Sequence, residues 1–286
     1  MHLCMHSFTY VRWESIYVSR QRLLIDCLID SLRQALYDTV SESISDVPRI
    51  AVSFSGGVDS SLLAKICNSP HLEKHVTLLT IGFSGSHDVN FSKYIAAKMG
   101  IDHKVYEITY GDFEENLHLV QELIRCNNTS HIENCIAYFY ICKLAKQNDV
   151  NVVLSANGCD ELFCGYDRYR SACHHSKRDA AISVLMDKMI ANELALIGEI
   201  KIVAAQLGVQ VRQPFLSARF IEFAKSIPID QKIKGPDDMI RKHILRQAAL
   251  AICVPEESAM KPKKALQYGS SIHKCYRKIE RGRRRE

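Results

Sequence analysis

Residues 55–60 read SGGVDS, which places two glycines, two serine hydroxyls and one carboxylate within six positions. The apolar run 50–54 leads into this segment, and apolar residues recur at helical spacing directly after it. A tight turn between a strand and a helix points several backbone N–H groups at the positive end of the helix dipole, where phosphate oxygens bind well. Gly56 and Gly57 would let the backbone approach closely and adopt positive φ angles. In such an anion site, the Asp59 carboxylate makes chemical sense mainly as a ligand of a cation such as Mg²⁺.

Two common nucleotide-binding loops do not fit residues 55–60. A Walker loop needs a four-residue gap and a Gly-Lys-Ser/Thr ending, and a dinucleotide fingerprint needs a different glycine spacing. The SGGxDS pattern instead resembles the pyrophosphate-binding loop of the N-type ATP pyrophosphatases, which split ATP into AMP and pyrophosphate. A glycine-rich turn without a ligand is the simpler alternative, and the flanking strand and helix favour the binding loop.

A second junction of strand and helix follows at residues 150–170, VNVVLSANGCDELFCGYDRYR. The run 150–155 ends in a polar Ser-Ala-Asn-Gly turn. Asp160 and Glu161 then fall at a helix start, where the helix dipole favours carboxylates. These two carboxylates could cap the helix, or they could contact a second cation or the substrate. The residues alone leave both interpretations open.

Between residues 50 and 155, short β-branched segments alternate with amphipathic ones. The predicted strands are 50–54, 76–82, 103–108 and 150–155, and the predicted helices are 20–40, 59–68, 88–99, 112–125 and 131–147. This rhythm predicts an α/β fold with a parallel sheet covered by helices on both faces. Ligands of such sheets bind at the carboxyl ends of the strands, and both glycine-bearing turns lie at such ends.

From about residue 160 the strand pattern is lost, and helices are predicted at 179–207, 217–226 and 238–251. The tail 274–286 carries a net charge of +5, which equals the charge of the entire chain. A basic tail would suit RNA or an acidic partner, although a solvated chain end is the simpler interpretation. We divide the chain into a leader with one helix, 1–44, and one domain, 45–286.

Composition narrows the class of protein further. The chain has 286 residues, of which 47% are apolar and 24% charged, as in an ordinary globular protein. No apolar run approaches the ~18 residues of a membrane-spanning helix, and the first residues lack a secretory signal. The 11 cysteines include no CxxC pair, and neither Cys135/Cys142 nor Cys159/Cys164 has zinc-site partners at useful spacing. We therefore expect reduced thiols, a cytoplasmic location and no membrane contact.

Four blocks resemble, in order, the synthetase domain of the asparagine synthetase family. They are SFSGGVDSSL, TIGFSGSHD, LSANGCDELFCGY, and VRQPFL with the later RKHILRQAA and KPKKALQYGS. Together they span about residues 45–272. The resemblance implies an adenine nucleotide α-hydrolase-like sheet with a mostly helical C-terminal portion.

The resemblance also implies a role for each block. The residues that would hold pyrophosphate and Mg²⁺ are Ser55, Gly56, Gly57, Asp59 and Ser60. The residues that would contact the rest of the nucleotide, in part through their backbone, are Phe54, Ile81, Ser155 and Ala156. Asp160 would hold a second Mg²⁺. Lys263 would stabilise the negative charge on the adenylate and the transition state, a role that requires no proton transfer.

The implied reaction has two steps and uses ATP and Mg²⁺. A small carboxylic acid, with aspartate as the family's acceptor, attacks the α-phosphorus of MgATP and releases pyrophosphate. Ammonia or another amine then displaces AMP from the acyl-adenylate and forms an amide. Positioning and charge neutralisation would supply most of the catalysis.

Two departures from the family pattern bear on this reaction. The family motif Ser-Gly-Glu-Gly-x-Asp-Glu has a glutamate proposed to manage protons, and Asn157 stands in its place; an amide accepts no proton near neutral pH. The cysteine of a glutaminase domain would follow the initiator Met, where the chain has His2, and about forty residues precede the sheet. We therefore expect nitrogen from free ammonia or a separate glutaminase subunit.

Two alternatives to the amide-forming ligase remain open from the sequence. A related enzyme of the same superfamily could adenylate RNA or a different small acid, which the basic tail and Asn157 favour. A nucleotide-binding subunit with little catalysis is the third alternative, which the substitutions around Asn157 favour and the intact SGGVDS segment opposes.

Overall fold

The computed structural model of the protein describes residues 5–262 and 265–283, and the side chains within 22–262 and 265–282. Its strands are β1 (Arg49–Ser53), β2 (His75–Phe83), β3 (Asp102–Ile108), β4 (Val152–Leu154) and β5 (Gln210–Arg212). The helices as far as β4 are α1 (Met5–Ile44), α2 (Val58–Cys67), α3 (His87–Met99), α4 (Tyr110–Ile124) and α5 (Thr129–Gln147). The later helices are α6 (Cys159–Leu162), α7 (Asp167–Ala172), α8 (Arg178–Gln206), α9 (Ala218–Ser226), α10 (His243–Ala251), α11 (Glu256–Ala259), α12 (Leu266–Gly269) and α13 (Ile272–Arg283).

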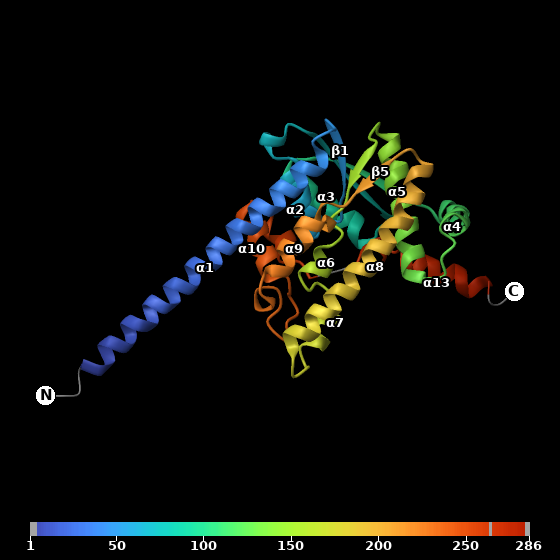
Figure 1. The fold of residues 1–286 in the computed structure, drawn as a ribbon. Helices are drawn as coiled ribbons and strands as arrows, with labels where there is room; N and C mark the ends of the chain where they lie inside the picture. Colours follow the sequence, from blue (N-terminus) through green and yellow to red (C-terminus); the bar gives the residue numbers. More distant parts are fainter. Residues whose placement is uncertain (1–4, 263–264, 284–286) are drawn as a thin grey trace.

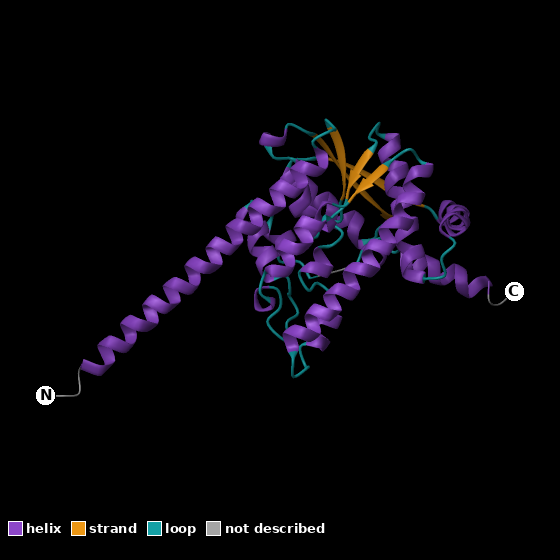
Figure 2. Cartoon of the chain, viewed as in Figure 1, coloured by secondary structure: helices purple, strands orange, loops and turns teal. Residues whose placement is uncertain are grey.

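The described strands form one parallel sheet in the order β3-β2-β1-β4-β5. The chain moves outward from β1 to β3 on one side, and β4 then returns to pair with the other side of β1. This reversal of strand order creates a crevice at the carboxyl ends of β1 and β4. The prediction of a parallel sheet covered by helices is confirmed, as Figures 1 and 2 show.

Alternate residues of the strands pack against helices on opposite faces of the sheet. Ile50 and Val52 belong to a core that includes α2, α9, α10 and the last turns of α1, whose Leu32 and Leu36 are buried there. Ala51 belongs to a second core, built from α4, α5, α13 and the C-terminal part of α8. The sheet is therefore the middle of three layers (Figure 2).

Several boundaries differ from the sequence prediction. Strand β5 was missed, because its three residues carry no β-branched run that periodicity could detect. The helix predicted over 238–251 begins at His243, since Arg241 and Lys242 adopt positive φ angles of 52° and 55° and lie outside it. In Figure 1 the first turns of α1 extend away from the three layers.

The membrane and cysteine predictions can be compared with the described residues. Among them, no helix combines the length and the apolar character that crossing a bilayer requires. Every cysteine whose side chain is described is free of disulfide bonds, and six of them are buried, namely Cys67, Cys135, Cys142, Cys159, Cys164 and Cys275.

The turn between β1 and α2 depends on one glycine more than the other. Gly56 has φ +73°, and a Cβ atom there would lie 2.9 Å from the Phe91 ring, so both the conformation and the close approach require glycine. Gly57 has φ −72° and is the residue preceding α2, so the expectation of a positive φ there is wrong. The close approach to Phe91 fixes the turn against α3.

We predict that Gly56→Ala destabilises the protein more than Gly85→Ala. Gly85 has nearly the same φ, +72°, but nothing lies within 4 Å of an added Cβ. Gly85→Ala should therefore cost only the backbone strain, about 1–2 kcal/mol, whereas Gly56→Ala adds overpacking of about 1–3 kcal/mol. Urea unfolding of both variants measures the difference. Equal losses would show that the Phe91 contact relaxes without cost.

Candidate active site

A cavity of about 570 Å³ lies at the carboxyl ends of β1 and β4. Its wall combines the β1–α2 turn, the turn after β4, the first half of α5, the middle of α8, and residues from 242 to 268. Eight of the predicted site residues line it, namely Ser55, Gly57, Asp59, Ser60, Ser155, Ala156, Asn157 and Asp160. The structure thus brings the two motifs, about one hundred residues apart in the sequence, to one cavity.

Three predicted residues that the structure describes do not line this cavity, namely Phe54, Gly56 and Ile81. Phe54 and Ile81 are buried in the sheet, and the backbone N–H and C=O of Phe54 already bond Leu79 and the Thr80 hydroxyl. Gly56 turns away as well, since its carbonyl accepts a hydrogen bond from the Ser258 hydroxyl at 2.7 Å. Lys263 lies outside the described residues, so its role stays a prediction.

Hydroxyls brace the β1–α2 turn internally. The Ser60 Oγ accepts from the Ser55 backbone N–H at 3.3 Å and donates to the Gly57 carbonyl at 3.2 Å. The turn leads into α2, which has ten residues and an acidic Asp59 in its first turn. The backbone N–H groups at the start of α2 are therefore held in a defined orientation beside the cavity, as anion binding requires.

A buried lysine connects the two motifs. The Lys242 Nζ lies 2.6 Å from the Asp59 Oδ2 and 2.7 Å from the Asp160 Oδ1, and Lys242 is only 1% exposed. Burial alone would lower the pKa of the Lys242 ammonium, but the carboxylates of Asp160 and Asp59 more than offset this and raise it. The three groups form a buried ion cluster with a permanently charged centre.

The close packing around this cluster explains a neighbouring glycine. A Cβ atom at Gly165 would lie 2.0 Å from the Asp160 Oδ1 and 2.4 Å from the Lys242 Cε. Any larger residue at position 165 would therefore separate Lys242 from Asp160.

The residues present fit a magnesium ion. The second oxygen of Asp59, Oδ1, is buried and has no hydrogen-bond partner among the described residues. Carboxylate oxygens with substrate phosphates are the ligands that Mg²⁺ prefers. Asp59 and Asp160 would hold it, and when bound it would neutralise charge on the phosphates.

Asn157 is the centre of a second polar network. Its Oδ1 accepts from the Tyr138 hydroxyl at 2.5 Å and from the Ser155 hydroxyl at 2.6 Å, and its Nδ2 donates to the Glu193 carboxylate. Glu193 comes from α8, is 7% exposed and lines the same cavity. The amide orientation is fully determined, because two donors face its oxygen and an acceptor faces its nitrogen.

Glu161 lies beside this network and carries a shifted pKa. Burial, together with the charges of Glu193 and Asp160, raises the pKa of Glu161 to about 8. Its carboxyl also accepts from the Gly158 backbone N–H at 3.1 Å and the Tyr166 hydroxyl at 2.6 Å. Glu161 therefore caps the start of α6, which was one of the two interpretations that the sequence left open. Asp160 instead contacts the buried ammonium of Lys242.

Sequence reasoning missed Lys242, Glu193 and Arg246, all of which line the cavity. Lys242 and Arg246 lie in the block RKHILRQAA, whose match was noticed without assigning a role to either cation. Glu193 lies within a long helical pattern with other charges, and no local signal separates it from a solvated residue.

The sheet order, the glycine turn at its switch point and the carboxylates beside it define an α/β protein with a candidate ligand site at the carboxyl edge of a parallel sheet. More narrowly, the chain belongs to the asparagine synthase family, whose model matches residues 31–201 and 187–285.

Two relatives illustrate the family match. The chain is 28% identical over 264 residues to a glutamine-hydrolysing asparagine synthetase of Gallus gallus, a match that covers 88% of this chain and 45% of that protein. It is 28% identical over 265 residues to the Homo sapiens protein of the same description, covering 89% and 46%. The chain spans about half the length of these curated relatives.

Solved structures are more distant. A U34-tRNA thiolase, NcsA, from Methanococcus maripaludis superposes with a TM-score of 0.47 at 13% identity, over 90% of this chain and 75% of that one. An NMN synthetase from Francisella tularensis gives 0.36 at 16% identity, over 69% and 92%.

We predict that Lys242→Met lowers the free energy of unfolding by about 3–5 kcal/mol, because it leaves the buried carboxylate of Asp160 and the half-buried one of Asp59 without their cation. Lys232→Met is the matched control. Lys232 is equally buried, but its Nζ donates only to the Ala224 carbonyl, and burial lowers its pKa to about 8. That variant should lose about 1 kcal/mol.

Urea unfolding at two pH values tests the electrostatic cause. In Lys242→Met, the carboxylates of Asp59 and Asp160 face each other without a cation, and their repulsion is greatest when both are charged. Acid should therefore reduce the loss of stability, and rising pH should increase it. A loss that does not change with pH would contradict this explanation.

Proposed function

We propose that the protein is an ATP-dependent amide-forming ligase that adenylates a small carboxylic acid, aspartate in the first instance, and releases pyrophosphate and AMP. Nitrogen would come from ammonia or from a separate glutaminase subunit. The single observation that carries the proposal is the arrangement of the β1–α2 turn and the Asp59–Lys242–Asp160 cluster on one cavity. Family membership supports the same class of chemistry.

On the nucleotide side, the chain supplies donors and fixed positive charge. The backbone N–H groups at the start of α2 would bind the leaving pyrophosphate. Lys242 would hold Asp59 and Asp160 in place, and Mg²⁺ when bound would supply charge neutralisation. A cation fixed before substrate binds stabilises developing charge without rearranging.

Arg246 organises the segment that leads to Lys263. Its guanidinium donates to the carbonyls of Ile240, Arg241, Ala259 and Lys261, at 2.5–3.0 Å, and is 3% exposed. Burial lowers the pKa of Arg246, an effect that the carboxylate of Asp59 opposes. Because four carbonyls use this one side chain, we assign Arg246 as a positioning residue for the stretch that ends in Lys261 and Pro262.

On the acceptor side, Glu193 would supply the carboxylate that position 157 lacks. Asn157 cannot accept a proton, but it holds the Glu193 carboxylate beside the turn after β4. Arg168 and Lys188 line the same cavity and are exposed, so they offer cations to the carboxylates of a small acid. We infer that the proton of the attacking amine passes to Glu193, with Asn157 orienting it.

One assay distinguishes this proposal from its alternatives. The full chain is incubated with MgATP, aspartate and ammonium, and pyrophosphate and asparagine are measured. Aspartate-dependent pyrophosphate together with asparagine supports the proposal. Pyrophosphate release that requires RNA or another acid supports the alternative of a related enzyme that adenylates those substrates. Magnesium-dependent ATP binding without turnover supports a nucleotide-binding subunit, and no such binding by calorimetry would overturn the assignment of the cavity.

Two variants refine the assay. Lys263→Ala should abolish pyrophosphate release while leaving the circular dichroism spectrum unchanged, as expected for a cation that stabilises the adenylate. Lys65→Ala, in the last turn of α2, is the control and should have normal activity. Unchanged turnover in Lys263→Ala would remove that residue from the proposal.

We predict that Glu193→Gln lowers kcat for amide formation by about 100-fold or more, because the proton acceptor is lost. ATP affinity should change little, since Glu193 belongs to the network around Asn157. Glu222→Gln, at an exposed position of α9, is the control.

A double variant separates a chemical role of Glu193 from a structural one. Asn157→Glu combined with Glu193→Gln exchanges the amide and the carboxylate between the two positions and keeps one negative charge. It should recover part of the activity that Glu193→Gln loses. Asn157→Glu alone places two carboxylates in contact in a buried site and should be less active than the natural chain. If Glu193→Gln keeps its full kcat, the assignment is wrong.

A further inference from the structure

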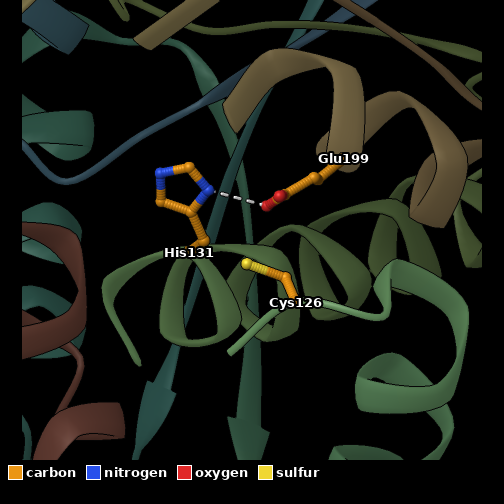
Figure 3. A group of neighbouring side chains, drawn as sticks. All are labelled: Cys126, His131 and Glu199. Carbon is orange, nitrogen blue, oxygen red and sulfur yellow. Dashed lines mark hydrogen bonds and ion pairs between the residues drawn. The ribbon is translucent and has the colours of Figure 1, made fainter. Parts of the chain in front are cut away.

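Three side chains that can bind metals converge next to the cavity. Cys126, His131 and Glu199 each offer a ligand atom, and these atoms lie within 4.8 Å of one another (Figure 3). Cys126 follows α4, His131 is in the first turn of α5, and Glu199 projects from α8. None of them takes part in the chemistry proposed above, although His131 also lines the cavity wall.

Local structure explains why Cys126 and His131 lie together. Arg125 ends α4 with φ +47°, and three residues later the Asn128 side chain caps the start of α5. The Asn128 backbone N–H donates to the Cys126 Sγ at 3.3 Å. This hydrogen bond fixes the position of the sulfur beside the start of α5.

A fourth group lies one helical turn further along. His131 and Cys135 are four residues apart in α5, a spacing that puts both on one face of the helix. The Cys135 Sγ lies 4.0 Å from the Glu199 Oε2 and is fully buried. The same Glu199 oxygen lies 2.9 Å from the His131 Nδ1.

The imidazole of His131 is only 7% exposed and faces the cluster through Nδ1. Nδ1 contacts the Glu199 carboxylate, while Nε2 lies on the opposite side of the ring, away from Glu199 and Cys126 (Figure 3). Nδ1 is therefore the nitrogen that His131 offers as a ligand.

We propose that Cys126, His131 and Glu199 bind a zinc-class divalent cation, with Cys135 placed to complete the coordination. A thiolate, an imidazole and a carboxylate are the ligands that zinc uses, whereas Mg²⁺ and Ca²⁺ require oxygen. Binding releases the proton of the Cys126 thiol, since only the thiolate is a ligand. The ion would tie the α4–α5 connection and the start of α5 to α8, and so fix one wall of the cavity.

The expectation that Cys135 and Cys142 have no zinc-site partners at useful spacing was formed from positions along the chain. Glu199 lies 68 residues from His131 and is brought there only by the packing of α8 on α5. Spacing along the chain cannot detect a site of this kind. Zinc binding by this cluster does not require the ligase activity proposed above.

The test measures metal binding directly and does not depend on activity. The full chain, purified with reduced thiols, is equilibrated with zinc, and the retained metal is measured after dialysis against a weak chelator. Substitution with cobalt adds a specific signature, because a thiolate ligand produces a sulfur-to-cobalt charge-transfer band. We expect one retained zinc per chain, a cobalt–thiolate band, and a higher unfolding temperature when zinc is present.

Matched variants assign the ligands. Cys126→Ser, His131→Ala and Glu199→Gln should each weaken zinc binding at least about tenfold, because even partners beyond the ligands contribute that much. Cys126→Ser should also remove the cobalt band unless Cys135 takes its place, and the double variant with Cys135→Ser settles that assignment. Cys253→Ser, at an exposed cysteine outside the cluster, should bind zinc normally.

Circular dichroism of each variant without metal confirms that the fold persists. If His131→Ala does not fold, the test relies on Cys126→Ser, because Cys126 is partly exposed and its substitution disturbs the core less. Absence of retained zinc in the natural chain, or retention that survives all three single substitutions, would overturn the proposal.

Discussion

The buried contact of Lys242 with Asp59 and Asp160 is the constraint on which the rest of the site depends. Asp59 lies in the first turn of α2 after β1, Asp160 lies in the first turn of α6 after β4, and Lys242 immediately precedes α10. Two carboxylates taken from water into one crevice would repel each other, so the fold needs a cation between them. The contact of the Lys242 ammonium with these carboxylates also holds α10 and the segments after it over the carboxyl edge of the sheet. These segments thereby form one wall of the cavity, and the ion cluster contributes shape as well as charge.

The same reasoning explains how Asn157 is accommodated. A glutamate at position 157 would add a negative charge beside Asp160, Glu161 and Glu193, and the pKa of Glu161 is already raised by its neighbours. An amide carries no charge and bonds Tyr138, Ser155 and Glu193 at once. The carboxylate that contacts the side chain of residue 157 therefore comes from α8. The motif alone does not reveal this acidic group, because Glu193 lies outside it.

The parts of the structure that sequence reasoning predicted are those with local signals. The segment 55–60 was found because strand, glycines and helix follow one another, and the order of strands and helices came from the same periodicities. The turn after β4 was found for the same reason. Lys242 was missed because its contact with Asp59 spans 183 residues, and Glu193 because its contact with Asn157 spans 36. Phe54 and Ile81 were assigned by resemblance, and the structure buries both in the sheet instead of placing them on the cavity wall.

Helices α5 and α8 carry both polar networks of the cavity wall. Tyr138 and His131 lie on α5, while Glu193 and Glu199 lie on α8, and the two pairs meet separately through Asn157 and through the direct contact of His131 with Glu199. Apolar residues of both helices belong to the same core, so a shift of one helix relative to the other changes both networks. A cation held by His131 and Glu199 would therefore resist the motion that separates Glu193 from Asn157. The position of Glu193 beside the turn after β4 thus depends on how α5 and α8 pack together, and both polar networks depend on that packing.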